Sequence, residues 1–221
     1  MKKLILTAVL VATAGLFAED KVAIKFELPA PHSSGTPKEV KSDNLEPDPG
    51  PGKYRPPIMV PAGFDKKLTT EETKVTTSEE AVTGENEYVV DGDKTPDATC
   101  MLQLPGGLQW VQLDLCEEKT VSAVCVWHDQ GDDRVYKDVI VQLSNDEKFA
   151  KDVTTIFNND HDNTAKLGKG ADKEYRERND GRPVSAMVDG KPTKARYVRC
   201  YSAGSSSEPV NNYIEIEVFG K

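Results

Sequence analysis

The chain has 221 residues and carries 28 Lys and Arg against 37 Asp and Glu, which gives a formal net charge of −9. Because binding to nucleic-acid phosphates rests on clustered Lys and Arg, this balance argues against a nucleic-acid partner. The length fits one or two globular domains.

The first 18 residues have the pattern of a secretory signal. Lys2 and Lys3 precede an apolar run over residues 4–17, and Ala18 before Glu19 is a suitable cleavage point. The alternative is a short N-terminal membrane anchor. No other stretch reaches the roughly 20 apolar residues that a span needs. The sequence therefore predicts a signal peptide over residues 1–18, a secreted or periplasmic protein, and no membrane insertion after signal cleavage.

Residues 19–62 differ in composition from the rest of the chain. Nine of the 14 prolines lie between Pro29 and Pro61, among Gly, Ser and charged residues. Such a segment buries too little apolar surface to offset the entropy of ordering it. We therefore expect a disordered, Pro-rich flexible linker over residues 19–62, with Arg55–Pro61 as a part that could dock on the domain.

From about Thr69 onward the chain reads as short β-strands. The runs are rich in Val, Ile, Tyr and Thr, and Gly, Pro, Asn and Asp separate them. Near the end, Ile214, Ile216 and Val218 alternate with Glu215 and Glu217. The expected strands are Glu87–Val90, Thr99–Leu104, Leu108–Leu115, Thr120–His128, Tyr136–Ser144, Val153–Phe157, Ala195–Ser202 and Tyr213–Phe219. The pattern predicts an all-β domain over residues 63–221, an antiparallel β-sandwich or jelly roll of about eight strands.

Four cysteines lie in this predicted domain. An even number in an exported protein permits two disulfides, in three pairings. Cys125 and Cys200 stand inside apolar runs, where a buried free thiol is the equal alternative. The pairing of Cys100, Cys116, Cys125 and Cys200 stays open at this point.

Five motifs resemble, in order, those of discoidin domains, which are also called coagulation factor V/VIII type C domains. They are Leu108–Leu115 (LQWVQLDL), Thr120–Val126, Asp138–Asp146 (DVIVQLSND), Ala195–Ser202 (ARYVRCYS) and Glu215–Gly220 (EIEVFG). Phe157–Asn163 (FNNDHDN) is similar to a loop of secreted bacterial members. The resemblance implies a galactose-binding-like jelly roll over about residues 68–220. Bacterial members are often family 32 carbohydrate-binding modules, and other members bind phospholipid, glycans or proteins.

The resemblance also implies one structural calcium ion. Family members hold it between an Asp-Gly loop and a Glu of the last strand, which correspond here to Asp91, Asp93 and Glu215. Calcium takes six to eight oxygen ligands, and loop carbonyls would supply the rest. The family's aromatic residue after this loop is missing, because Pro96 and Asp97 follow Thr95. The alternative is a plain Asp-Gly turn between strands.

Carbohydrate sites need an apolar ring and a few aimed donors and acceptors. The polar segment Trp127–Tyr136 offers His128 and Arg134 for sugar hydroxyls, and Trp127 or Tyr136 for the ring. Two alternatives stand beside this hypothesis. Trp127 continues the face of Val121, Ala123 and Cys125 and is favoured as a core residue, and Arg134 could form a surface ion pair with Asp132 or Asp133.

A second group of polar residues lies in the long loop after Phe157. Asn158, Asn159, Asp160 and His161 bring many oxygen ligands and one imidazole. Long irregular loops on compact domains are usually functional or mobile. We expect these residues to line the carbohydrate site beside His128 or to bind calcium, although Asn and Asp are also ordinary loop formers.

No catalytic motif stands out. The chain has three His, no Gly-x-Ser-x-Gly elbow and no His-Glu-x-x-His. The sequence therefore predicts a secreted, non-catalytic carbohydrate-binding module that recognises glycan through loops at one end of the sandwich. The alternative is an extracellular protein-interaction or adhesion module whose partner is a cell-envelope protein.

Overall fold

The computed structural model describes residues 20–30, 40–48, 50, 53–132 and 134–221, so the predicted signal peptide lies outside the described residues. These residues form strands and one short 3-10 helix, η1 (Asn86–Val90). None of the helical structure in the described ranges has the length and apolar character that crossing a membrane requires. The strands are β1 (Lys21–Ala23), β2 (Met59–Pro61), β3 (Lys66–Lys67), β4 (Lys74–Thr77), β5 (Leu102–Leu104), β6 (Gln109–His128), β7 (Ile140–Ser144), β8 (Thr154–Asn158), β9 (Arg182–Ser185), β10 (Met187–Val188), β11 (Lys191–Ser202) and β12 (Asn211–Gly220).

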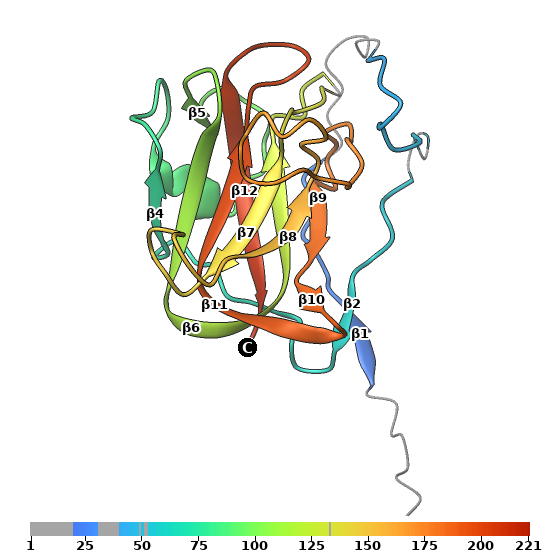
Figure 1. Ribbon diagram of the computed structural model, residues 1–221, viewed down its shortest axis with the longest axis vertical. Helices are drawn as coiled ribbons and strands as arrows, with labels where there is room; N and C mark the ends of the chain where they lie inside the picture. The colour runs from blue at the N-terminus through green and yellow to red at the C-terminus, as the bar shows by residue number, and fades with distance from the viewer. Residues whose placement is uncertain (1–19, 31–39, 49, 51–52, 133) are drawn as a thin grey trace, which may run out of the picture.

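The strands form two layers that share β6 (Figure 1). The first half of β6 pairs with β4 and β11, and β7 and β8 extend this first layer. The second half of β6 pairs with β12 and β9, and β12 also pairs with the short strands β3 and β5. These strands make the second layer. All of these pairings are antiparallel, which confirms the predicted all-β sandwich.

One strand replaces two that the sequence predicts. Leu108–Leu115 and Thr120–His128 were expected to be separate, but β6 is continuous and curves at the lower end of Figure 1. At the curve Cys116 has a φ of 69°, in the left-handed region, and its N–H donates to Asp114 Oδ1 at 2.8 Å. This local contact lets one strand pass from the first layer to the second.

The core lies between the two layers. Because side chains alternate along a strand, every second residue faces inward. The inward set is fully buried and comes from both halves of β6 and from β7, β11 and β12: Val111, Leu113, Val124, Val126, Val141, Val198, Ile216 and Val218. Ile216 and Val218 face this core as predicted. Ile214 instead packs beside Trp127, because the register shifts between Tyr213 and Glu215.

The predicted strand Glu87–Val90 is wrong. This run forms η1, and its buried residues Val89 and Val90 pack into the main core. Periodicity does not separate a strand from a helical turn in so short an apolar run.

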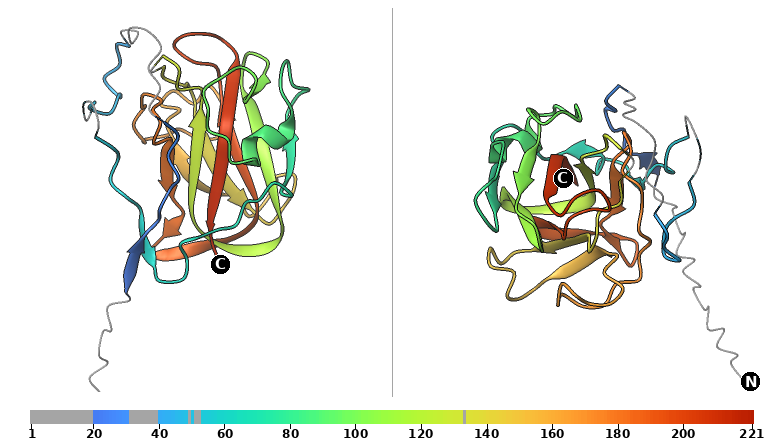
Figure 2. Two further views of the ribbon diagram at one scale, coloured as in Figure 1. Left: turned by 180° about the vertical axis from the view of Figure 1, so that it is seen from behind. Right: turned by 90° about the horizontal axis from the view of Figure 1, so that it is seen from above.

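The N-terminal segment covers the outer face of the second layer. Ile24 is 3% exposed and Val60 is fully buried, and both pack with Ala123 and Phe219. The Phe26 ring meets the Trp127 ring edge-on at 6.0 Å between centroids. Figure 2 shows β1 and the chain around it running along one side of the sandwich. This face of the sheet is therefore buried rather than exposed to water.

Polar contacts also tie this segment to the domain. The Arg55 guanidinium donates to Glu46 Oε1 at 2.7 Å, to Asp180 Oδ1 at 2.8 Å and to the Gly181 carbonyl at 2.7 Å. Arg182 Nη1 donates to Glu46 Oε2 at 2.8 Å. These contacts correct the expected disordered, flexible linker over residues 19–62 for its described parts. The docking expected for Arg55–Pro61 is confirmed.

Candidate functional site

Three loops meet at one end of the sandwich, at the top of Figure 1. Backbone hydrogen bonds join them. Ala203 N donates to the Lys137 carbonyl at 2.8 Å, Lys137 N donates to the Gly204 carbonyl at 2.9 Å, and Glu177 N donates to the Arg134 carbonyl at 2.8 Å. We call this region the loop end; among the described residues it consists of 129–132 and 134–139, 159–181 and 203–210.

Arg134 is held near the surface of the loop end by three carboxylates. Its Nη1 lies 2.9 Å from Asp129 Oδ2 and also pairs with Glu208, and its Nε lies 2.6 Å from Asp132 Oδ1. Burial alone lowers the pKa of Arg134, but the hydrogen bond with Asp132 and the charge of Asp129 raise it above the usual value. The side chain keeps 11% of its surface exposed. The ion pair expected with Asp132 is confirmed, whereas Asp133 lies outside the described residues.

His128 and Tyr136 do not reach the surface. His128 is fully buried, and its Nδ1 lies 2.8 Å from Glu177 Oε1. Its ring stacks on Tyr136 at 4.3 Å and lies 4.5 Å from the Tyr213 ring. Burial raises the pKa of Tyr136 above its usual range. The structure thus corrects the expectation that these two side chains contact carbohydrate directly: they support the loop from below.

Asn158, Asn159 and Asp160 build the second loop rather than its surface. All three are buried. Asn159 Oδ1 accepts from Val139 N at 2.7 Å, and the Asp160 carboxylate accepts from Thr164 N at 3.1 Å and from Ala165 N at 2.9 Å. Asn158 Nδ2 donates to the Gly168 carbonyl at 2.9 Å. Direct ligand contact, which the sequence suggested for these three, does not fit this burial.

His161 is half-buried, and its neighbours form an acidic group. Asp138, Asp160 and Asp162 bring carboxylate oxygens within 4.8 Å of one another, and no other three acidic, His or Cys side chains do so in the described part of the chain. Burial first, then the charges of the two neighbours, raises the pKa of Asp138. The sequence placed oxygen ligands here and missed Asp138, which joins through its contact with Thr164 at 2.9 Å.

Two residues that shape the loop end have no signal in the sequence. Glu208 pairs with Arg134 although 74 positions separate them, and its Oε1 also accepts from Asn212 Nδ2 at 2.7 Å. Glu177 pairs with His128 across 49 positions. Both stand in charged or polar stretches that look solvated, and only the meeting of the loops shows their partners.

A family profile for the F5/8 type C domain matches residues 74–216, which is more than half of the chain. The chain belongs to the F5/8 type C domain family. No curated protein sequence matches it. Several similar solved structures are family 32 carbohydrate-binding modules.

Three similar solved structures illustrate the likeness. A family 89 glycoside hydrolase from Clostridium perfringens, in complex with 2-acetamido-1,2-dideoxynojirimycin, has 20% identity and a TM-score of 0.50, over 70% of this chain and 14% of that chain. The family 32 module of C. perfringens NanJ, in complex with galactose, has 13% identity and a TM-score of 0.48, over 69% and 97%. The module of AlyQ, in complex with 4,5-unsaturated mannuronic acid, has 23% identity and a TM-score of 0.48, over 66% and 93%.

Among the described residues of this F5/8 type C domain, the predicted calcium ligands Asp91, Asp93 and Glu215 do not bring their carboxylate oxygens within 4.8 Å of one another. Asp91 and Asp93 are exposed, and each accepts a hydrogen bond from its own loop: Asp93 N to Asp91 Oδ1 at 2.8 Å and Thr95 N to Asp93 Oδ1 at 2.9 Å. Glu215 is fully buried, and Gly92 N donates to its Oε2 at 3.1 Å. Burial raises the pKa of Glu215 to about 8.

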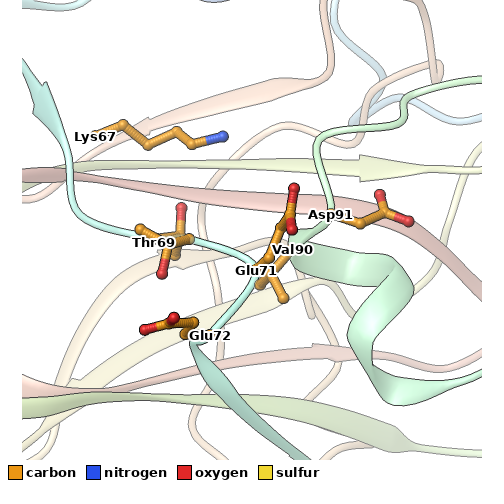
Figure 3. Close-up of a pocket in the computed structure, with 7 residues that line it drawn as sticks. Lys67, Thr69, Glu71, Glu72, Val90 and Asp91 are labelled. Atoms are coloured by element: carbon orange, nitrogen blue, oxygen red, sulfur yellow. The ribbon is translucent and has the colours of Figure 1, made fainter.

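A pocket of ≈480 Å³ lies beside this loop (Figure 3). Lys67, Glu71, Glu72 and Asp91 are among the residues that line it. A calcium ion in this pocket would therefore meet the Lys67 ammonium. At Glu215 the carboxylate is faced by the Lys67 ammonium and by the Gly92 N–H, which both repel a cation, so the groups around Glu215 do not fit a calcium ion.

Proposed function

We propose that this F5/8 type C domain is an exported, non-catalytic carbohydrate-binding module that holds a glycan at the loop end. The observation that carries the proposal is the fixed, partly exposed guanidinium of Arg134 among three carboxylates. The fold it shares with carbohydrate-binding modules supports the same reading. The basic and apolar pattern over residues 1–18 supports export.

The chemistry of this cluster suits sugar hydroxyls. A hydroxyl donates one hydrogen bond and accepts others, so it can bridge an arginine and a carboxylate. Asp129, Asp132 and Glu208 supply acceptors, and Arg134 supplies donors in a fixed fork. The ion pairs hold these groups in place before a ligand arrives, which lowers the entropy cost of binding. Only a small part of this cluster is accessible, with 11% of the Arg134 side chain exposed, so we expect weak, millimolar affinity.

The same contacts support a non-catalytic role. A glycosidase needs one carboxyl group free to give a proton and a second free to attack or to activate water. The three carboxylates around Arg134, those of Asp129, Asp132 and Glu208, are all engaged with its guanidinium.

Retention on a glycan array and in affinity gels tests the proposal. We expect the wild-type chain to bind at least one glycan at about millimolar concentration, and Arg134→Met to weaken that binding by at least about tenfold, since a hydrogen bond to a charged group is worth roughly 1.5–3 kcal/mol. Arg196→Met is the matched control, because Arg196 also forms an ion pair with an aspartate, on the outer face of the first layer. Absence of binding to every glycan would overturn the proposal and leave a cell-envelope protein as the partner to test.

A further inference from the structure

Two carboxylates are buried on the outer face of the second layer. Glu215 lies opposite Trp127 in the sheet, and Glu217 lies opposite Cys125. The side chain of Glu215 has no exposed surface and that of Glu217 has 4%. Taking a carboxylate out of water is costly unless a cation or hydrogen bonds compensate it. A positive charge near the side chains of Glu215 and Glu217 is therefore required in the folded protein.

Lys94 supplies that charge from within the protein. Its side chain is 4% exposed, and its Nζ lies 2.9 Å from Glu217 Oε1. The same ammonium lies 4.8 Å from the centre of the Trp127 ring, within the range of a cation–π contact. A lysine so deeply buried needs a partner as much as the glutamate does. Both needs are met by one contact.

Lys67 is a second, more exposed cation at the same carboxylates. Its Nζ lies 3.2 Å from Glu217 Oε1 and 3.9 Å from Glu215 Oε1, and its side chain is 38% exposed. Glu215 Oε1 has no hydrogen-bond partner, so Lys67 is its nearest charge complement. Two ammonium groups thus face the side chains of Glu215 and Glu217, so positive charge is already present where a calcium ion would bring it.

We propose that Lys94, assisted by Lys67, is the resident cation of this site and takes the structural place of the calcium ion that the family resemblance implied. In the loop Asp91–Lys94, the Asp91 and Asp93 carboxylates accept hydrogen bonds from backbone N–H groups of residues 93 and 95, and the Lys94 side chain points inward to Glu217. A divalent ion at Glu215 would lie close to both ammonium groups. Because these groups stay positively charged, repulsion would oppose its entry. The domain therefore keeps its stability without calcium.

Thermal unfolding of the full chain in EDTA and in CaCl2 tests this inference first. We expect the two melting temperatures to agree within about 1 °C at about 10 mM CaCl2, a concentration above the usual dissociation constants of extracellular calcium sites. A rise of several degrees that Glu215→Gln abolishes would overturn the proposal. A rise that persists in Glu215→Gln places the ion elsewhere and supports it.

Variants of the lysines give the second test. We expect Lys94→Met to lower the melting temperature by about 10 °C, because it leaves Glu217 buried without its closest cation. Lys67→Met is the matched control and should cost no more than about 3 °C, since Lys67 is partly exposed. The double variant K94M/E217Q should recover part of the loss, which separates the charge contact from lost packing. An unchanged melting temperature in Lys94→Met would contradict the inference.

Discussion

Asp114 and Arg196 form a two-pronged ion pair on the outer face of the first layer. Arg196 Nε lies 2.7 Å from Asp114 Oδ1, and Nη2 lies 2.8 Å from Oδ2. This hydrogen bonding to Arg196 is the main reason that the pKa of Asp114 lies below its usual value, and the Cys116 N–H adds to it. The folded state therefore binds a proton at Asp114 less readily than the unfolded state does.

Stability should change with pH in one direction because of this pair. The contribution of Asp114 is present above the unfolded pKa of about 3.9 and is lost as the pH falls through the lower, folded pKa. Asp114→Asn should lower the free energy of unfolding at neutral pH, and its difference from wild type should narrow in acid. Urea unfolding at several pH values measures both. Glu118→Gln is the control: its exposed pair with Lys194 should contribute nothing measurable. If the difference in free energy of unfolding between wild type and Asp114→Asn stayed constant down to the lowest pH, the pair would not be the source of the pH dependence.

The pairing of the cysteines and some partners of the loop-end residues could not be predicted from the sequence. All four cysteines are free: Cys125 and Cys200 are buried, and burial raises the pKa of both thiols. The alternatives of disulfide and free thiol could not be separated earlier, because pairing depends on distance in space. For the same reason the neighbour Asp132 could be predicted as a partner of Arg134, whereas Glu208 could not.

At the scale of elements, period-two patterning predicted the main strands because the apolar side chains of β6, β7, β11 and β12 face one core. It did not predict β1 and β2. These strands have three residues each, and Pro, Gly and charged residues separate them in the chain. β1 and β2 are ordered because the segment that carries them packs on the apolar outer face of the second layer. The pattern of a two-layer sandwich assigns this face to solvent.

Single substitutions in β2 and beside β1 test whether this cover is part of the fold. Ile24→Ala should lower the free energy of unfolding by about 2–4 kcal/mol, because Ile24 is 3% exposed against Ala123 and Phe219. Met59→Ala in β2 is the control, since Met59 is 47% exposed and should change stability by no more than about 0.5 kcal/mol. Urea unfolding of the full chain measures both. Equal, small effects would mean that the segment is not packed in solution.

At the scale of the whole molecule, the folded unit begins before the boundary that composition suggests. The drop in apolar content over residues 19–62 marks a change in sequence, not the edge of the packed domain. Ile24 and Val60 pack on one face, and Arg55 binds the loop that also carries Glu177. Because Glu177 supports His128 and the Arg134 carbonyl, the N-terminal segment connects to the loop end through that loop.

Truncation measures how far stability and binding depend on this cover. A chain of residues 63–221 should melt more than about 10 °C below a chain of residues 20–221, since several apolar side chains, each worth roughly 1.5–3 kcal/mol, lose their buried contacts. It should also bind a hydrophobic dye, because removal of the segment exposes the Trp127 and Phe219 side of the sheet. Glycan binding should weaken together with stability, because the loop that holds Glu177 loses the Arg55 contacts. Equal melting temperatures for the two chains would show instead that residues 63–221 fold independently and that the segment only rests on their surface.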